Sequence, residues 1–416
     1  MEERKRKKIY FRRKKFLAVI LTGLIFAYSA MNIYTFGDEY LYDIEHIWNN
    51  LTAGRSTVSH AVEKLEDSLS DDMYEKMKFI EAFSYVNVLL DKREISNFSF
   101  IKDETGSLHY ASFYRDHDSE IFEYALRIDR LQDYVSENGT DVLFVMAPSK
   151  YAPNDERLRV GLPVNDPHNN LNELMFYLNR LGVNTLDLNN YIPNDTVTYD
   201  DAFYKTDHHW TIDAAYYSTR LLVDKLNKDF GYDLDTKTYL SDGSYTRVRY
   251  ENGMLGSMGR ATGVCFSGLD DFTAYYPNYQ MNFYRYYLDD DKDEFELEGD
   301  ITQTLMNYEE LYSSDDVYEI SQYGLYLDEL EVYEHIVNRD NPDGPKILFI
   351  RDSYFSPVIT FMAPMCSEID AIWNMDKSHT IEIDDYLSSN TYDCIILEYY
   401  PYNIEDRGFS FFRETD

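Results

Sequence analysis

The sequence predicts a mainly parallel β-sheet covered by helices on both faces, preceded by one membrane-spanning helix. Apolar runs such as DVLFVMA (141–147) and KILFI (346–350) alternate with helical patterns, as in parallel α/β proteins. An uncharged run of residues, long enough to cross a bilayer, lies close to the N-terminus. With 416 residues, of which 44% are hydrophobic and 16% aromatic, the chain can bury a large core.

The N-terminal segment predicts a membrane anchor. Residues 1–15 contain nine Lys or Arg against two Glu, and residues 16–34 carry no charge. At ~1.5 Å per residue this run spans ~28 Å, and the basic head favours a cytoplasmic N-terminus. We therefore assign 1–15 to the head and 16–36 to a single-pass anchor that exposes the body outside a bacterial cell membrane. The alternative is a cleavable signal peptide with Ala27-Tyr28-Ser29 as its cleavage site, although the apolar run continues past Ser29.

Composition excludes two classes of protein. The formal net charge is −36, so the body would repel nucleic acid. Cys265, Cys366 and Cys394 are too few for a disulfide framework. Few thiols in an exported chain agree with a bacterial exterior.

Residues 37–94 are expected to form an extracellular stalk followed by a packing helix. Ser70-Asp71-Asp72 would cap this helix, which would run to about Leu90. Its packing face would consist of apolar residues recurring every three positions: Met77, Ile80, Phe83, Val86 and Leu89.

Residues 95–403 are expected to form one catalytic domain, with 404–416 as a tail. A hairpin is predicted at 98–113, and helices at 120–137, 170–181 and 212–228. Further strands are predicted at 183–188, 369–373 and 392–397. The acidic, tyrosine-rich stretch at about 230–340 would be an insertion between the two halves of the sheet.

Two distant segments carry residues suited to nucleophilic catalysis. Ser353 follows a buried strand and precedes a helix, which would expose its hydroxyl at the carboxyl edge of the sheet. Asp207-His208-His209-Trp210 lies in a turn-rich segment just before another helix. In an extended segment Asp207 and His209 would share a face and His208 would point the other way. A carboxylate-oriented imidazole aimed at a serine is the arrangement of a catalytic triad.

Two alternatives compete with this interpretation. Asp207, His208 and His209 could instead bind a metal with His379 as a further ligand, although the cysteines are far away. The histidines could also be turn residues without chemistry. Without a base, Ser353 would be an ordinary helix cap. We expect no metal and no cofactor.

The segment YKTDHHWTIDAAY (204–216) resembles the signature of the DHHW family, which is similar to alginate O-acetylation proteins of the AlgX and AlgJ type. These resemble SGNH hydrolases with a rearranged catalytic order. Other matching motifs follow in the family's order: KDETGSLHY (102–110), MAPSK (146–150), GSMGRATG (256–263), DDF (270–272), ILFIRDSYFSP (347–357) and IILEYYPYN (395–403). The resemblance implies a three-layer α/β/α SGNH-hydrolase-like fold.

The resemblance implies that Ser353 is the nucleophile, His209 the general base and Asp207 the group that orients it. Four further residues are candidates for substrate binding, although Arg260 could equally form a surface ion pair: Lys150, Arg260, Arg351 and Tyr399. Arg351 replaces the glycine of the wider SGNH pattern, so the backbone N–H of Ser353 is the one oxyanion donor we can name. Pro401-Tyr402 after Glu398 replaces the Glu-Arg pair of relatives.

The implied activity is transfer of an acyl group, acetyl in the family, to hydroxyls of a cell-surface or secreted polysaccharide. A multi-pass membrane O-acyltransferase would supply the acyl group from across the membrane. Two alternatives remain open: an esterase that removes acetyl groups with the same triad, and a non-catalytic scaffold of the cell envelope.

Overall fold

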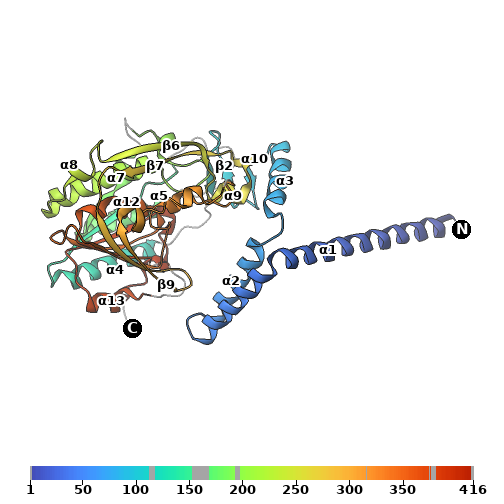
Figure 1. The fold of residues 1–416 in the computed structure, drawn as a ribbon, viewed down its shortest axis with the longest axis horizontal. Helices are drawn as coiled ribbons and strands as arrows, with labels where there is room; N and C mark the ends of the chain where they lie inside the picture. Colours follow the sequence, from blue (N-terminus) through green and yellow to red (C-terminus); the bar gives the residue numbers. More distant parts are fainter. Residues whose placement is uncertain are drawn as a thin grey trace. The chain divides into compact units, whose positions relative to one another are not determined.

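The computed structural model describes residues 2–111, 118–151, 168–192, 197–314, 316–373, 375 and 381–413 (Figure 1). The chain divides into two units, Met1–Ala82 and Phe83–Asp416.

The first unit is built on a long helix, α1 (Glu2–Thr52), paired with α2 (Val58–Asp71). Within the described residues one helical segment, Arg13–Thr52, is long and apolar enough to cross a membrane. The helix continues beyond the predicted anchor, so the first part of the expected stalk is helical. The Ser68 hydroxyl donates to Asp43 at 2.7 Å and the Tyr40 hydroxyl donates to the Asp72 carbonyl at 2.5 Å, which joins the polar end of α1 to α2.

The expected helix cap at 70–72 is wrong. Ser70 and Asp71 belong to the end of α2, where the Asp72 N–H donates to the Ser68 carbonyl at 3.1 Å. The next helix, α3, is Lys76–Leu89. Serine and aspartate are favoured just before a helix because their side chains accept hydrogen bonds from its first N–H groups. The same polar residues also occur at the C-terminal end of a helix.

The expected packing face of α3 is also wrong. Phe83, Val86 and Leu89 are exposed, whereas the small polar residues Ser84 and Asn87 are buried. Each step of three residues turns a helix by about 300°, so the five apolar residues from Met77 to Leu89 spread over roughly two thirds of its circumference and cannot all face the core.

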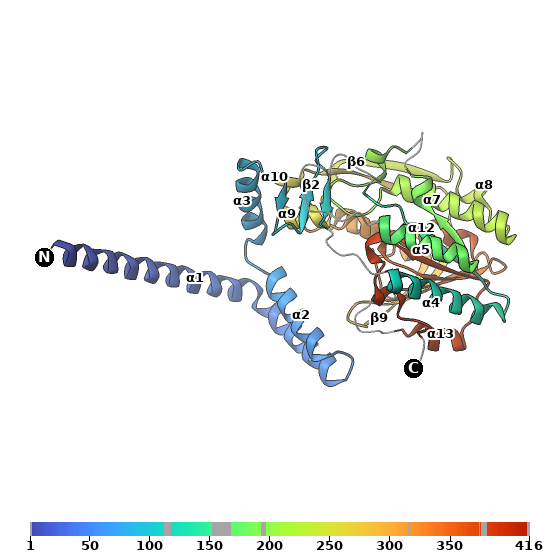
Figure 2. The same cartoon turned by 180° about the vertical axis from the view of Figure 1, so that it is seen from behind.

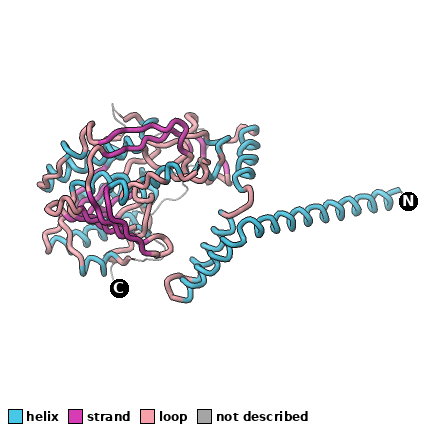
Figure 3. The backbone as a smooth tube through the Cα atoms, viewed as in Figure 1, coloured by secondary structure: helices cyan, strands magenta, loops and turns pink. Residues whose placement is uncertain are grey.

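The second unit contains an eight-stranded sheet (Figure 3). Its order is β5-β4-β13-β11-β12-β10-β8-β9, and the first five strands are parallel. Their bounds are β4 Asp141–Met146, β5 Asn184–Asp187, β11 Lys346–Ile350, β12 Glu368–Ile372 and β13 Cys394–Tyr399. The mainly parallel sheet is therefore confirmed, with β13 ending two residues later than predicted.

Helices cover both faces of the sheet, which makes three layers (Figure 2). One face packs against α7 (Ile212–Lys225) and α12 (Ser356–Met362). The other packs against α4 (Asp118–Ser136), α5 (His168–Leu181) and α13 (Ile383–Ser389). Successive residues of β11 pack into hydrophobic cores on opposite faces of the sheet. Ile347 and Phe349 belong to the core under α7 and α12, and Leu348 and Ile350 belong to the core under α4, α5 and α13.

The stretch at 230–340 contributes to the central sheet. Three of its strands, β8 (Asn282–Leu288), β9 (Glu294–Asp300) and β10 (Tyr333–Asn338), extend the sheet with antiparallel pairing. The acidic run at 289–294 forms the turn between β8 and β9 and the start of β9. Cross-strand packing of alternating aromatic residues explains why an acidic segment forms strands here.

Smaller elements complete the second unit. The predicted hairpin is present as β2 and β3, paired with β1. A second antiparallel pair is formed by β6 and β7. The remaining bounds are β1 Glu94–Ile95, β2 Phe100–Lys102, β3 Leu108–Tyr110, β6 Tyr245–Met254, β7 Asp270–Pro277, α6 Tyr199–Ala202, α8 Thr236–Tyr239, α9 Ser257–Thr262, α10 Val264–Ser267 and α11 Ile301–Thr304.

A buried ion-pair network joins the antiparallel strands β8 and β10 to the segment that follows the parallel strand β11. Glu334 on β10 accepts from Arg285 at 2.7 and 3.0 Å and from Arg351 at 2.5 Å, and all three side chains are at most 1% exposed. A substitution that removes the charge of Glu334 takes this carboxylate partner away from the buried guanidinium groups of Arg285 and Arg351.

Glu334→Gln should lower the free energy of unfolding by roughly 3–5 kcal/mol, because the buried Arg351 would lose its carboxylate partner and Arg285 would be left with its pair to Asp328. Urea denaturation would measure this. The matched control is Glu298→Gln, which removes the exposed pair with Arg339 and should cost less than about 1 kcal/mol. Equal losses in the two variants would contradict the prediction.

Candidate active site

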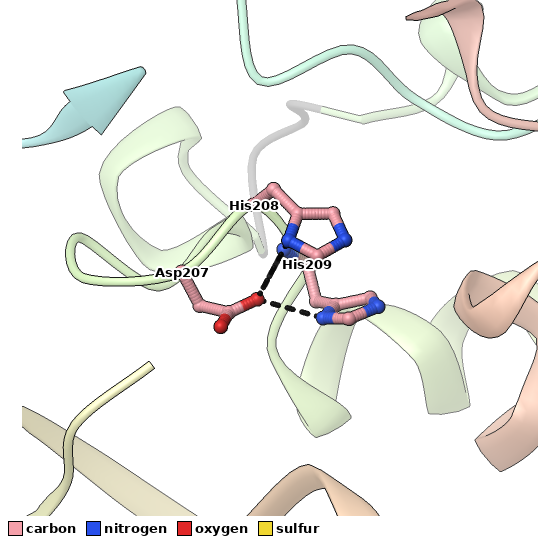
Figure 4. Close-up of side chains that lie close together, drawn as sticks. All are labelled: Asp207, His208 and His209. Atoms are coloured by element: carbon pink, nitrogen blue, oxygen red, sulfur yellow. Dashed lines mark hydrogen bonds and ion pairs between the residues drawn. The ribbon is translucent and has the colours of Figure 1, made fainter. Parts of the chain in front are cut away.

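The DHHW segment is a turn between α6 and α7. The Tyr204 N–H donates to the His209 carbonyl at 3.2 Å, and Phe203 pairs with Trp210 as an isolated bridge. The Asp207 carboxylate accepts from the His209 backbone N–H at 2.9 Å and from His209 Nδ1 at 2.7 Å (Figure 4). The carboxylate thus sets both the position and the ring orientation of His209.

Ser353 lies on the other side of this imidazole. It begins the 3-10 turn Ser353–Phe355, which follows β11 after Arg351 and Asp352 at the carboxyl edge of the sheet. Its Oγ is 2.7 Å from His209 Nε2, although 144 residues separate them in the chain. The structure therefore brings together the serine, histidine and aspartate that sequence analysis assigned to a triad, with hydrogen-bonding distances on both sides of the ring.

The electrostatics suit an imidazole that takes up a proton. Burial acts against its charged form, but the carboxylate of Asp207 outweighs burial and raises the pKa of His209 above its ordinary value. Burial likewise acts to raise the pKa of Asp207, yet His208 and His209 hold it well below its usual range. Asp207 is therefore a carboxylate at neutral pH and stabilises the imidazolium.

His208 does not point away from the site as expected. Its ring centroid lies 3.9 Å from that of His209, and its Nδ1 lies 3.3 Å from Asp207 Oδ1 (Figure 4). The alternation of faces holds for extended backbone, and this segment is a tight turn. Burial and the neighbouring His209 lower the pKa of His208 to about 3, so it is neutral at physiological pH.

The metal alternative involves the same residues. Asp207, His208 and His209 each offer one potential ligand atom, and these atoms lie within 4.8 Å of one another. The fourth candidate, His379, lies outside the described residues. The direct hydrogen bond of Asp207 to His209 Nδ1 is the contact an acid–base pair uses.

Two motifs of unassigned role hold the DHHW turn in place. Lys150, from the segment after β4, donates through Nζ to the carbonyls of Asp207 at 2.6 Å and Lys205 at 3.2 Å. Asp270 at the start of β7 accepts from the backbone N–H groups of Lys205 at 2.9 Å and Thr206 at 2.7 Å. These buried charged side chains replace the hydrogen bonds that a turn in water would make.

The third motif, at the start of α9, reaches the aspartate itself. The Ser257 N–H donates to Asp207 Oδ2 at 2.6 Å, and Gly256 passes directly against the aspartate. A Cβ at position 256 would lie 2.3 Å from Asp207 Cβ and 2.5 Å from its Oδ2. Only glycine allows this approach.

Gly256→Ala should displace Asp207 and with it His209, at a cost of about 1–3 kcal/mol for overpacking and on the order of 10²-fold in activity for a misplaced base. Thermal unfolding and hydrolysis of a small ester would measure the two effects. The control is Gly243→Ala, where no atom lies within 4 Å of the added Cβ and little change is expected. Wild-type activity in Gly256→Ala would contradict the prediction.

The backbone around Ser353 is arranged by Asp352. Its carboxylate accepts from the N–H of Tyr354 at 3.0 Å and the N–H of Tyr400 at 2.8 Å. The Ser353 N–H is the first of its helical turn and so has no acceptor within it. It is the donor best suited to a developing oxyanion. Burial and the nearby Asp352 raise the pKa of Glu398 well above its ordinary value, which favours the protonated form of this carboxyl.

Sequence analysis missed Tyr323. Its ring stacks on the imidazole of His209, with centroids 3.9 Å apart and 14° between the planes. Trp210 Nε1 donates to the Tyr323 hydroxyl at 3.0 Å, which ties the last residue of the DHHW motif to the stack. Tyr323 comes from the 3-10 turn Gln322–Leu325, more than 100 residues away, and no local pattern marks it among forty tyrosines.

The four residues considered for substrate binding lie in different surroundings. Lys150 donates to a backbone carbonyl of the DHHW turn, and Arg260 donates to the Ile320 carbonyl at 2.9 Å. Arg351 is fully buried in the network with Glu334, and Tyr399 is fully buried with its hydroxyl donating to the Gly408 carbonyl at 2.5 Å. Because neither Arg351 nor Tyr399 reaches the surface, we propose no substrate contact for them.

Fold and site together define an SGNH-hydrolase-like α/β domain. Residues 108–262 match the family described as "SGNH hydrolase-like domain, acetyltransferase AlgX". This match confirms the resemblance found in the sequence and includes the DHHW turn, whereas Ser353 lies beyond it. It supports an enzyme of the acetyltransferase or esterase kind. Among curated proteins, none matches this sequence significantly.

Solved structures share the fold over most of the chain. Bacillus cereus PatB1, in a structure with a sulfonyl adduct, is 18% identical, covers 76% of this chain and 97% of its own, and has a TM-score of 0.61. A DHHW family protein from Eubacterium siraeum is 17% identical, with coverage of 76% and 96% and a TM-score of 0.54. The O-acetyltransferase domain of Pseudomonas putida AlgJ is 10% identical, with coverage of 76% and 94% and a TM-score of 0.40.

Proposed function

We propose that this protein transfers an acyl group, acetyl by resemblance, to hydroxyls of a cell-surface or secreted polysaccharide outside the membrane. The observation that carries the proposal is the continuous contact from Ser353 Oγ through His209 to Asp207, at 2.7 Å on each side of the ring. The family match over 108–262, described as an acetyltransferase, supports acyl transfer as the reaction class.

The reaction takes two steps. Ser353 Oγ attacks the carbonyl carbon of the acyl donor while His209 takes its proton, and the proton passes to the leaving group. The acyl-serine is then attacked by a sugar hydroxyl, whose proton moves to His209 and back to Ser353. Asp207 stabilises the imidazolium in both steps, and the Ser353 N–H stabilises the oxyanion.

The N-terminal helix supports a membrane location. The basic head favours a cytoplasmic N-terminus, which leaves the acidic body outside. A multi-pass membrane O-acyltransferase would deliver the acyl group to Ser353, and the anchor would keep the body beside this partner. Arg260 and Lys150, the two remaining candidates, would frame the site, and Lys150 would do so through the DHHW turn.

Two measurements test the proposal. Peptide mass spectrometry after incubation of the purified full chain with an acyl ester should find the acyl group on Ser353, and none in Ser353→Ala. Loss of polysaccharide acetylation in a Ser353→Ala strain supports transfer, a gain supports removal by an esterase, and no change supports a scaffold. The last two results would overturn the proposal.

A further inference from the structure

Helix α3 buries small polar residues and exposes large apolar ones, which is the reverse of the arrangement expected for a helix in water. Ser84 and Asn87 are 0% and 3% exposed, whereas Phe83 and Leu89 are 53% and 66% exposed. Burial of apolar side chains is the main favourable term in folding, so the exposed face forgoes a large stabilisation in water. A contiguous apolar surface of this kind marks an interaction site.

The buried side of α3 has the composition found inside membrane proteins. Asn87 Nδ2 donates to the Phe83 carbonyl at 2.8 Å, within the helix itself, and Ser84 Oγ has no hydrogen-bond partner among the described residues. A helix that faces lipid has this pattern, with small and polar residues on its inner side and large apolar residues on its outer side.

The beginning of α3 contacts the predicted membrane segment within the first unit. The Tyr28 hydroxyl donates to the Tyr74 carbonyl at 2.6 Å, and the Tyr74 N–H donates to Asn32 Oδ1 at 2.6 Å. The rings of Tyr28 and Phe79 meet edge to face with centroids 5.7 Å apart. Tyr28 precedes the end of the apolar run by six residues, or ~9 Å of helix, which is the depth that interfacial helices reach.

Charge also permits this segment to approach a bilayer. Residues 73–94 contain four basic and four acidic side chains, so their formal charge is zero in a chain whose net charge is −36. An anionic lipid surface repels the acidic body but not this segment.

We propose that α3 lies in the membrane–water interface at the outer surface of the membrane, with its exposed apolar face among the lipid acyl chains. This face consists of Phe83, Val86, Leu89 and Leu90. The proposal does not depend on the chemistry of Ser353, so it can fail while acyl transfer holds, and the reverse.

The test places a tryptophan on the face in the full-length protein, reconstituted in phosphatidylcholine nanodiscs with or without a nitroxide on the lipid acyl chains. Phe83→Trp is compared with Phe176→Trp on α5, where the native side chain is equally exposed at 54%. The three native tryptophans give the same background in both variants. We expect nitroxide lipid to quench most of the added emission of Phe83→Trp and to leave that of Phe176→Trp unchanged.

Equal quenching in the two variants would overturn the proposal. So would a blue-shifted emission of Phe83→Trp that nitroxide lipid does not quench, because that result assigns the face to a protein contact such as a second copy. Val86→Trp, also on the exposed face, repeats the test if Phe83→Trp misfolds. In cells, a benzophenone side chain at position 83 that forms mainly protein adducts would also overturn it.

Discussion

Ser353→Ala should lower the turnover of an acyl ester on the order of 10⁴–10⁶-fold, because removal of the nucleophile of a serine triad leaves only the contributions of binding and the oxyanion site. His209 Nε2 is 2.7 Å from this hydroxyl and would have no proton to accept. Since Ser353 is half-buried at the rim of the sheet and its hydroxyl pairs with the imidazole, the variant should fold normally.

The measurement is hydrolysis or transfer from a small chromogenic ester under single-turnover and steady-state conditions. Ser388→Ala, an exposed serine on α13, is the control and should keep wild-type rates. Circular dichroism would verify that both variants are folded. A Ser353→Ala protein that keeps more than a small fraction of wild-type turnover would place the nucleophile elsewhere.

Asp207→Asn should lower kcat/KM by roughly 10⁴-fold, the loss seen when the aspartate of a serine triad is made neutral. An amide can present its NH₂ to His209 Nδ1 and so favour the wrong tautomer. The Ser257 N–H, which donates to Asp207 Oδ2 at 2.6 Å, would also meet a weaker acceptor. The change keeps the shape of the side chain, so the effect should be electrostatic.

The same variant should move the pH profile in a defined direction. His209 must be neutral to accept the serine proton, so activity falls as pH drops through the pKa of His209. Asp207 raises that pKa above its ordinary value, against the opposing effect of burial. Loss of the carboxylate should therefore shift the acidic limb of the profile to lower pH while the plateau falls.

Measuring kcat/KM against pH for wild type and Asp207→Asn separates these two effects. Asp201→Asn is a suitable control, because this exposed aspartate lies on α6, six residues from Asp207. It should change neither the plateau nor the limb. An acidic limb that stays in place, or moves to higher pH, in Asp207→Asn would show that Asp207 does not set the pKa of His209.

The buried strands were predictable from local patterns. Runs such as Asp141–Met146 and Lys346–Ile350 are too apolar to face water on either side, so they read as central parallel strands. Ser353 could be placed at the carboxyl edge because it follows such a strand. The adjacency of Asp207 and His209 also followed from sequence, since both belong to one short motif.

The strands at 282–338 were not predictable as part of the central sheet. Their pairing depends on β10 lying antiparallel to β12, and such long-range partners leave no mark in a local window. The same holds for Tyr323, whose stacking on His209 depends on how a distant segment folds back. The predicted outward direction of His208 was wrong because a turn does not obey strand alternation.

By itself, the sequence determined the class of fold, the membrane-type N-terminus and the residue types available for acyl transfer, because each depends on patterns within a few consecutive residues. Only the tertiary structure decided that a hydroxyl and an imidazole 144 residues apart meet at 2.7 Å, that Arg351 is enclosed with Glu334, and that α3 exposes its apolar side. These contacts depend on how whole elements pack, and packing is a property of the complete chain.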